Sequence, residues 1–156
     1  MPKLNADQIT LLAYYYLREE VMDGGFIQLI HNGLGGFIFL NPFARAIREW
    51  GLPTLSPIIN GCHKLYKKYR EELEKDYTDE EFMALFEKYP DFDKYDDAFV
   101  ESEEEFTEAV ARYNFIANGR LPVAKAIRCK VNANERNNKT KYAVFDFVIP
   151  ECSLTY

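Results

Sequence analysis

Hydrophobic and polar positions in the first part of the chain alternate with the period of α-helices. Asn5 followed by Gln8 fits a capping box, in which each side chain bonds the other residue's backbone N–H. Two glycines, Gly24 and Gly25, end the pattern, since glycine adopts conformations that stop a helix. A short apolar run at 26–30 predicts a second helix, which the glycine-rich stretch at 32–36 interrupts. The apolar stripe of the first helix consists of Ile9, Leu12, Tyr16 and Leu17.

Three further helix starts follow at intervals. Asn41-Pro42 opens a helix that ends at Gly51, because proline suits the first helical turn. Ser56-Pro57 opens a longer one, whose apolar positions continue to about residue 73. Thr78 with Glu81 makes a second capping box, which predicts a short helix to about residue 88.

The acidic stretch 90–100 has aromatic residues but is predicted to be an irregular connection. Ser102 with Glu105 then resembles a third capping box, and a last helix should end at Asn118-Gly119. Its expected buried side chains are Phe106, Val110, Tyr113 and Ala117.

The pattern changes after Pro122. Segments 123–131 and 142–149 are rich in β-formers and a polar connection separates them, so they predict a β-hairpin at about 120–150. We therefore expect a mainly α (α+β) class: one domain over 1–156, with a multi-helix part at about 5–119 and a C-terminal β-hairpin.

Composition supports a folded protein in a reducing compartment. Of the 156 residues, 47% are hydrophobic and 15% aromatic, enough to form a core. No segment is long and apolar enough to span a bilayer, and no secretion signal is visible, so we expect a cytoplasmic protein. The odd cysteine count without metal spacing agrees with free thiols; the cysteines are Cys62, Cys129 and Cys152.

Charge is distributed very unevenly. Residues 71–108 hold seventeen acidic residues against three lysines, whereas the rest of the chain holds sixteen basic residues against eight acidic ones. Like charges repel each other, so this concentration indicates either a well-solvated face or a surface for a basic protein. The predicted partner-binding residues are Asp91, Asp93, Asp96, Asp97, Glu101, Glu104, Glu105 and Glu108.

Signals for catalysis and ligands are sparse. His31 or His63 could join a serine or cysteine in space, but neither lies in a nucleophile motif. Glycines 33, 35 and 36 do not complete a nucleotide-binding fingerprint. The aspartates at 91–97 could gather around calcium, although the order of an EF-hand loop is absent. We predict no catalytic residue, metal or cofactor.

Basic residues of the C-terminal segment offer a further alternative. They could form a nucleic-acid patch, but a nearby acidic region would repel phosphate and no aromatic platform accompanies them. A solvated face, or pairing with the acidic region, is favoured, and no direct nucleic-acid or membrane partner is predicted. They are Arg120, Lys125, Arg128, Lys130, Arg136, Lys139 and Lys141.

One motif carries a resemblance. The run Asp23-Gly24-Gly25-Phe26-Ile27-Gln28-Leu29-Ile30-His31-Asn32 resembles the signature of a bacterial family of helical domains typified by a DNA mimic, and the acidic-aromatic run at 91–99 is similar to another segment of that family. The resemblance covers about residues 10–115. It implies a mainly helical fold, dimerisation, no catalytic centre, and an acidic surface that occupies the DNA-binding face of a transcription regulator.

Physically, the motif is expected to be structural. Gly24 and Gly25 permit a sharp turn between helices, and Phe26 anchors it in the core. Gln28 and Asn32 could satisfy backbone groups at the break.

The leading hypothesis is a non-enzymatic, acidic protein-interaction domain that acts as a DNA mimic toward a basic DNA-binding regulator. Two alternatives stay open: an immunity-type inhibitor of a basic nuclease toxin, and a small hydrolase that uses the carboxylates near residues 91–97.

Overall fold

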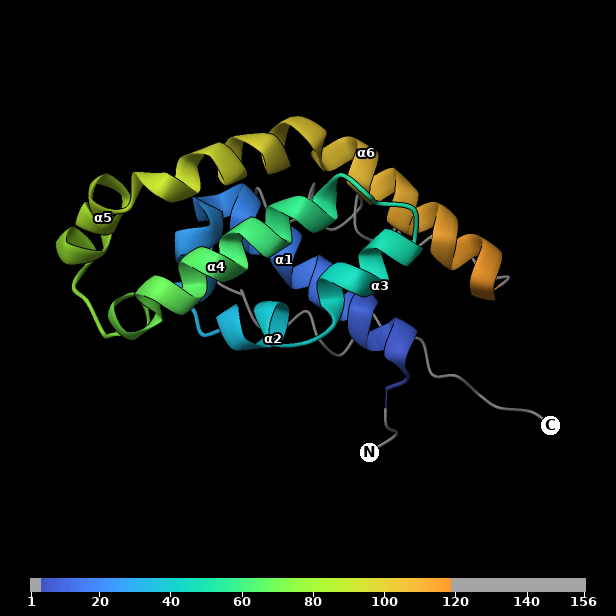
Figure 1. The fold of residues 1–156 in the computed structure, drawn as a ribbon, viewed down its shortest axis with the longest axis horizontal. Coiled ribbons are helices and arrows are strands. Elements are labelled where there is room, and N and C mark those ends of the chain that lie inside the picture. Colours follow the sequence, from blue (N-terminus) through green and yellow to red (C-terminus); the bar gives the residue numbers. More distant parts are fainter. Residues whose placement is uncertain (1–3, 119–156) are drawn as a thin grey trace, which may run out of the picture. The chain divides into compact units, whose positions relative to one another are not determined.

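The computed structural model describes residues 4–118, and these fold as helices joined by short turns (Figure 1). In chain order the elements are α1 (Ala6–His31), α2 (Gly35–Phe39), α3 (Phe43–Glu49), α4 (Leu55–Leu73), α5 (Asp79–Lys88), the 3₁₀ turn η1 (Pro90–Phe92) and α6 (Asp93–Asn118). The chain divides into two compact units between Val110 and Ala111, so only the last turns of α6 belong to the described part of the second unit. Everything that follows concerns the first unit.

Two helices begin where the predicted capping boxes lie. The backbone N–H of Gln8 donates to Asn5 Oδ1 at 2.8 Å, and the backbone N–H of Asn5 donates to Gln8 Oε1 at 2.9 Å. Thr78 and Glu81 make the same reciprocal pair at the start of α5, at 3.3 and 3.0 Å. Both pairs satisfy N–H groups that have no partner within the helix.

A sharp kink divides α1 at Gly24 and Gly25. Both residues leave helical geometry, and Gly25 has φ 71°, a value that L side chains rarely adopt. The helix resumes at Phe26 and ends at His31. The sequence predicted two helices separated by the glycines, which matches the two arms of α1.

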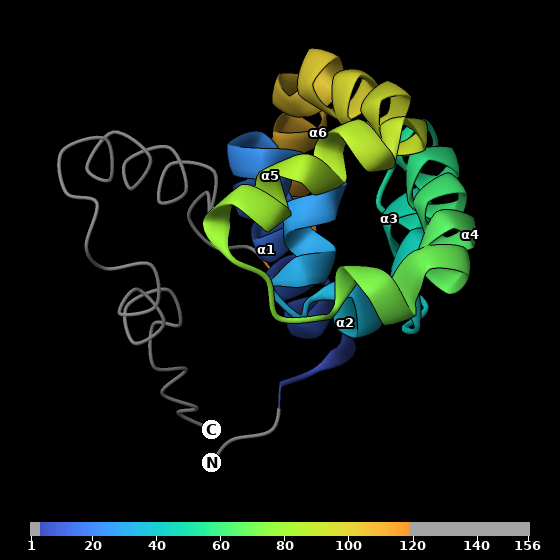
Figure 2. The same ribbon diagram turned by 90° about the vertical axis from the view of Figure 1, so that its left-hand side faces the viewer.

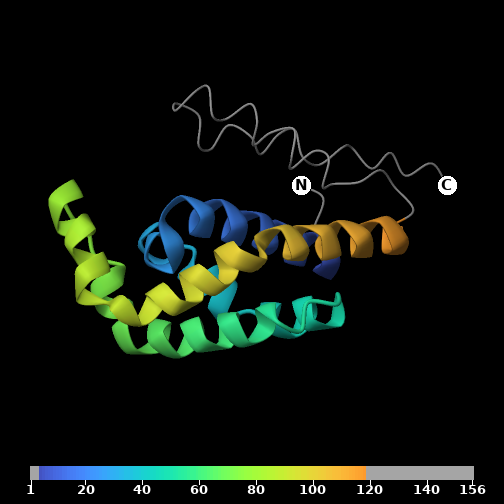
Figure 3. The same cartoon turned by 90° about the horizontal axis from the view of Figure 1, so that it is seen from above.

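Aromatic side chains fill the core of the first unit. Phe26, fully buried, contacts Phe99 of α6 edge-on at 6.3 Å between ring centroids and Phe39 of α2 at 6.4 Å. Phe39 in turn packs on Tyr66 of α4 at 5.2 Å. Figures 2 and 3 show α1, α4 and the first part of α6 running lengthwise beside one another, with α2 at the edge of α1 and α4. The second arm of α1 therefore lies at the centre of this core.

The structure corrects the expected fold class. Residues 4–118 contain helices and no strand, so the mixed α+β class is wrong for the described part, which is helical throughout. That class depended on the segment at about 120–150 alone, and the predicted hairpin lies outside the described residues.

Three local predictions are also wrong. Residues 93–100 are helical instead of irregular, so α6 begins at Asp93 and Ser102 lies inside it rather than at a cap. Ser56 is likewise within α4, whose N-cap is Thr54. The break predicted at 32–36 is present only at residues 32–34, because α2 already begins at Gly35.

Candidate functional site

The early start of α6 changes the arrangement of its acidic residues. With about 100° of rotation per residue, six exposed carboxylates fall within an arc of about 120° on one side of the helix. We call these residues the acidic stripe: Asp93, Asp97, Glu101, Glu104, Glu105 and Glu108.

The acidic stripe has the charge spacing of a nucleic-acid strand. From residue 93 to 108 the helix rises by roughly 22 Å at ~1.5 Å per residue, which gives one carboxylate per roughly 4 Å. One strand of duplex DNA carries a phosphate per ~3.4 Å of axis. In linear density the stripe therefore resembles a single DNA strand.

Buried rings occupy the opposite side of this segment. Phe92, Phe99 and Phe106 follow one another at seven-residue intervals, and each is at most 1% exposed. Phe99 and Phe106 contact each other at 5.7 Å between ring centroids. Because seven residues are nearly two helical turns, these rings form a ridge that holds the stripe toward solvent.

A buried polar network fixes α6 against the first arm of α1. Arg18 Nε donates to Glu103 Oε1, and the side chains of both residues are nearly buried, at 13% and 10% exposure. Thr107 donates its hydroxyl to the same carboxylate at 2.6 Å, and the hydroxyls of Thr107 and Tyr14 are hydrogen-bonded at 2.8 Å. Burial raises the pKa of Tyr14 above its ordinary range. Glu103 is thus a structural acid, unlike its exposed neighbours at 104 and 105.

Asp96 also has a partner inside the molecule. Its Oδ1 accepts the backbone N–H of Phe26 at 2.8 Å, which caps the second arm of α1 at the kink. Burial raises the pKa of Asp96 from 3.8 to about 6, and the nearby carboxylates of Asp93 and Asp97 add to the increase, although the Phe26 N–H opposes it. Seven of the eight predicted partner-binding residues are exposed, whereas Asp96 is partly buried.

The last predicted residue, Asp91, precedes the helix. It is exposed, and the hydroxyl of Tyr69 donates to its Oδ2 at 3.4 Å. Asp91 therefore lies in η1, just before α6 and next to α4, and extends the negative surface beyond the acidic stripe.

Side chains of the glycine motif bind a buried carboxylate. Gln28 Nε2 and Asn32 Nδ2 both donate to Glu20 Oε2, at 2.9 and 2.7 Å, and Gln28 also donates to Asp23 at 2.7 Å. Glu20 is only 7% exposed. The partners of these amides are carboxylates of the first arm of α1, whereas the sequence suggested backbone groups. The two arms are therefore joined across the kink by hydrogen bonds.

Ion pairs within the described residues do not include Asp93, Asp97, Glu101, Glu104 or Glu105 of the acidic stripe. Within residues 4–118, ion pairs join Arg18 to Glu19 and Glu103, Arg45 to Glu49, Arg70 to Glu74 and Lys88 to Glu72. These five stripe carboxylates therefore keep their negative charge facing solvent. Lys94, on the same helix, lies over the ring of Tyr95 at 4.9 Å instead.

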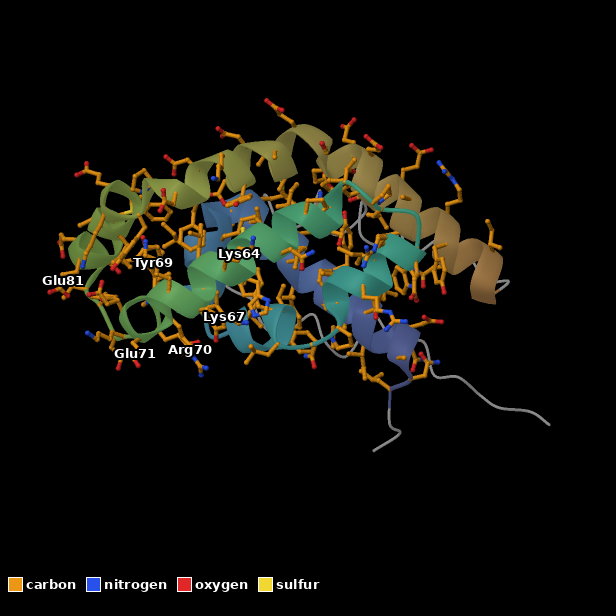
Figure 4. All side chains as sticks on the ribbon, viewed as in Figure 1. Lys64, Lys67, Tyr69, Arg70, Glu71 and Glu81 are labelled. Carbon is orange, nitrogen blue, oxygen red and sulfur yellow. The ribbon has the colours of Figure 1, made fainter. Side chains whose placement is uncertain are left out.

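A positive surface on α4 was missed by the sequence reasoning. Lys64, Lys67 and Lys68 are exposed at positions three and four apart, which places them on one side of the helix. Figure 4 shows Lys64 and Lys67 on α4, with Arg70 further along it and the acidic residues Glu71 and Glu81 near its end and on α5. The three- and four-residue spacing of these lysines could have been recognised from the sequence. They were overlooked because the adjoining segment, 71–108, has a large excess of acidic residues.

Other candidate chemistry finds little support in the described part of the chain. His31 Nδ1 lies 3.2 Å from the carbonyl oxygen of Leu73, and its ring packs on Phe82 at 4.7 Å. Among residues 4–118 no group of three histidine, cysteine or acidic side chains could hold a metal ion.

No helix of this part is long and apolar enough to cross a membrane. Cys62 is a buried free thiol, and Cys129 and Cys152 lie outside the described residues.

Comparison with known proteins identifies the relatives of this chain. A curated protein of Neisseria meningitidis serogroup B (strain ATCC BAA-335 / MC58), named DNA mimic protein DMP19, is 34% identical over 104 residues. The match covers 65% of this chain and 62% of that protein. The family model described as DMP19-like protein matches residues 2–118, almost the same span that the structure describes. This match extends over well more than half of the sequence, and the chain accordingly belongs to the DMP19-like protein family.

Proposed function

We propose that this protein is a DNA mimic, which uses the acidic stripe to occupy the DNA-binding surface of a basic protein, with a DNA-binding transcription regulator as the preferred partner. The observation that carries the proposal is the set of six exposed carboxylates on one side of α6, whose average charge per length is close to that of one DNA strand. The name of the Neisseria relative, a DNA mimic protein, supports the same function.

Rigidity supports the proposal as well. Arg18, Glu103 and Thr107 join α6 to α1 through buried polar contacts, and Asp96 joins it to the kink. A mobile acidic segment would lose conformational entropy when it binds, whereas a stripe that is already fixed in place loses little. The lysines of α4 would repel a basic partner, so we expect that partner to approach α6 and to avoid the α4 surface.

The test compares two variants with the same change in charge. In the stripe variant, Asp97→Asn, Glu101→Gln, Glu104→Gln and Glu105→Gln are combined. In the control, four other exposed acids are neutralised: Glu71→Gln, Asp76→Asn, Glu80→Gln and Glu87→Gln. Both variants and the unchanged protein are immobilised and exposed to extract of the native cell, and bound proteins are identified by mass spectrometry.

A captured DNA-binding protein should bind the stripe variant roughly tenfold more weakly or worse, because the lost contacts are charge-assisted, and should bind the control almost normally. Binding should weaken steeply between ~50 and ~200 mM salt, as phosphate contacts do. Duplex DNA carrying the regulator's own site should displace the captured protein competitively.

Simultaneous binding of DNA and this protein to the regulator would contradict mimicry. A captured nuclease whose activity is blocked would favour the immunity-type alternative instead. The proposal assigns no chemical step to the chain, and dimerisation, which the resemblance implies, stays a prediction that sedimentation can test.

A further inference from the structure

Two exposed apolar side chains lie at the border of the acidic stripe. Met22 of α1 is 42% exposed, and Val100 of α6 is 49% exposed. With about 100° of rotation per residue, Val100 falls about 20° outside the arc of the stripe. Asp97 and Glu104, three residues before it and four after it, lie on the same face of the helix. An apolar side chain therefore borders the row of carboxylates.

The contacts between α1 and α6 place Met22 opposite Val100. Figures 2 and 3 show the two helices beside each other, and two contacts described above fix their antiparallel register: Arg18 to Glu103, and Phe26 to Asp96. Met22 is four residues from both α1 positions, and Val100 is three and four residues from the α6 positions. Because four residues correspond to about 40° of rotation, each side chain lies just outside the contact between the helices. We call Met22 and Val100 the apolar edge.

The charges around the apolar edge favour a cationic partner. Arg18 is already paired with Glu19 and Glu103, so its positive charge is compensated. Asp97 and Glu104 are exposed and belong to none of the ion pairs of the described residues. Apolar side chains scattered singly are ordinary on protein surfaces, whereas an apolar centre with a polar rim is the arrangement of a protein contact.

DNA itself offers apolar groups beside its phosphates. Thymine presents a methyl group in the major groove, and proteins that read it place apolar side chains next to their lysines and arginines. A mimic with carboxylates alone would leave such a side chain without an apolar contact. The apolar edge supplies one at the border of the stripe.

We propose that the apolar edge receives an apolar side chain of the basic partner, in the place that a thymine methyl group takes on DNA. This inference rests on the proposed function and narrows the partner to proteins that carry an apolar side chain among lysines and arginines. The carboxylates attract the partner at long range, and the apolar edge adds a contact that salt does not screen.

The test titrates the full-length protein with two peptides in a calorimeter. One probe is rich in lysine and arginine and has two central leucines, and the other has serines in place of the leucines. The edge variant combines Met22→Gln with Val100→Thr, which nearly preserve side-chain size. The control variant combines Leu40→Gln with Met83→Gln, which change apolar side chains 59% and 63% exposed, after α2 and on α5.

The unchanged protein should bind the leucine peptide roughly fivefold more tightly than the serine peptide. The edge variant should lose this preference and bind the serine peptide normally, whereas the control variant should keep the preference. Raising the salt from ~50 to ~200 mM should weaken both peptides and leave their ratio unchanged. In ¹H–¹⁵N spectra, shifts specific to the leucine peptide should be largest for residues 18–26 and 96–104.

The outcomes separate this inference from the proposed function. Equal binding of the two peptides by the unchanged protein, or a preference that survives in the edge variant, would overturn the inference alone. The stripe variant should weaken both peptides about equally, and its normal binding of the serine peptide would contradict recognition of charge by the stripe. Failure of both peptides to bind the unchanged protein would overturn both proposals. Thermal melting checks that each variant keeps the fold.

Discussion

At the scale of single residues, the most informative contact joins Asp96 to the kink of α1. The carboxylate accepts the N–H of Phe26 and lies directly against Gly25. A residue of the acidic segment thus accepts a hydrogen bond from the glycine motif, 70 positions earlier in the chain. The sequence could not reveal this pairing, because nothing in their local patterns distinguishes Asp96 from Asp93 or Asp97.

Gly25→Ala should destabilise the protein more than a change at an unconstrained glycine. At Gly25 a Cβ would meet Asp96 Oδ2 at 2.5 Å, in addition to the strain of φ 71°. We expect a loss of roughly 2–4 kcal/mol in the free energy of unfolding, of which about 1–2 is backbone strain. Gly33→Ala is the matched control, since Gly33 has φ 82° but open space around it. Urea denaturation of both variants measures the difference, and equal losses would show that the Asp96 contact contributes nothing.

Asp96→Asn should change how stability depends on pH. In the folded protein the pKa of Asp96 is about 6, above its ordinary value of 3.8, so between these values the folded state holds more protons than the unfolded state. Stability from this group is therefore greatest below pH 4 and declines as pH rises to about 6, then stays constant.

The asparagine variant cannot titrate at this position. Its unfolding free energy, compared with that of the unchanged protein, should improve by roughly 1–2 kcal/mol between pH 4 and pH 6.5, after allowance for the partial exposure of the carboxylate. Urea titrations at four pH values measure this difference. A constant difference across the range would contradict the raised pKa.

At the scale of elements, predictions from sequence succeeded where local chemistry decides the outcome and failed where tertiary packing does. The capping boxes at Asn5 and Thr78 were correctly predicted because both partners lie within four residues. The start of α6 at Asp93 was not predicted. Ser102 and Glu105 have the residue types of a capping box, although they lie inside a continuous helix. The seven-residue spacing of Phe92, Phe99 and Phe106 was a signal for that continuous helix.

The candidate site shows the same limit. Charge concentration on residues 91–108 was evident from the sequence, and seven of the eight predicted residues are exposed. That six of them share one side depends on the helix beginning at Asp93, which the sequence reasoning missed. The distinct role of Glu103 depends on Arg18, 85 residues away in the chain.

Glu101→Gln should stabilise α6. Asp97, Glu101 and Glu105 are four residues apart, and each like-charged pair at this spacing costs about 0.2–0.5 kcal/mol. Removing the central charge relieves two such pairs, so we expect a gain of roughly 0.5–1 kcal/mol at low salt. The gain should disappear near 1 M salt, where charges are screened within ~3 Å. Thermal melting at two salt concentrations tests this, and a loss of stability would indicate that Glu101 has an unseen favourable partner.

At the scale of the whole first unit, charge is separated by sign between two helices. The acidic stripe is on α6, and the lysines at 64, 67 and 68 are on α4. The negative net charge of the chain conceals this separation. A basic partner of the proposed kind would therefore be attracted to one side of the unit and repelled from another, which would restrict the orientation of the proposed complex.

Combined Lys64→Glu and Lys67→Glu substitutions should relax that restriction. Association with a basic partner should become severalfold faster at low salt, because the added negative charge strengthens long-range attraction. The dissociation rate should hardly change, since the altered side chains lie outside the proposed interface. Stopped-flow or surface-binding kinetics separates the two rates. A large change in dissociation would mean that α4 contacts the partner directly.

The buried bond between Arg18 and Glu103 has a consequence for how this surface can evolve. Together with the buried phenylalanine ridge and the Asp96 contact, it fixes the rotation of α6 about its axis, so that Glu104, Glu105 and Glu108 point outward. Insertion of one residue after Glu103 would turn the downstream acids by about 100°, whereas insertion of seven would nearly restore their direction. Lengthening this helix by heptads would therefore extend the row of negative charge on the same side, whereas a single inserted residue would divide the row between two sides.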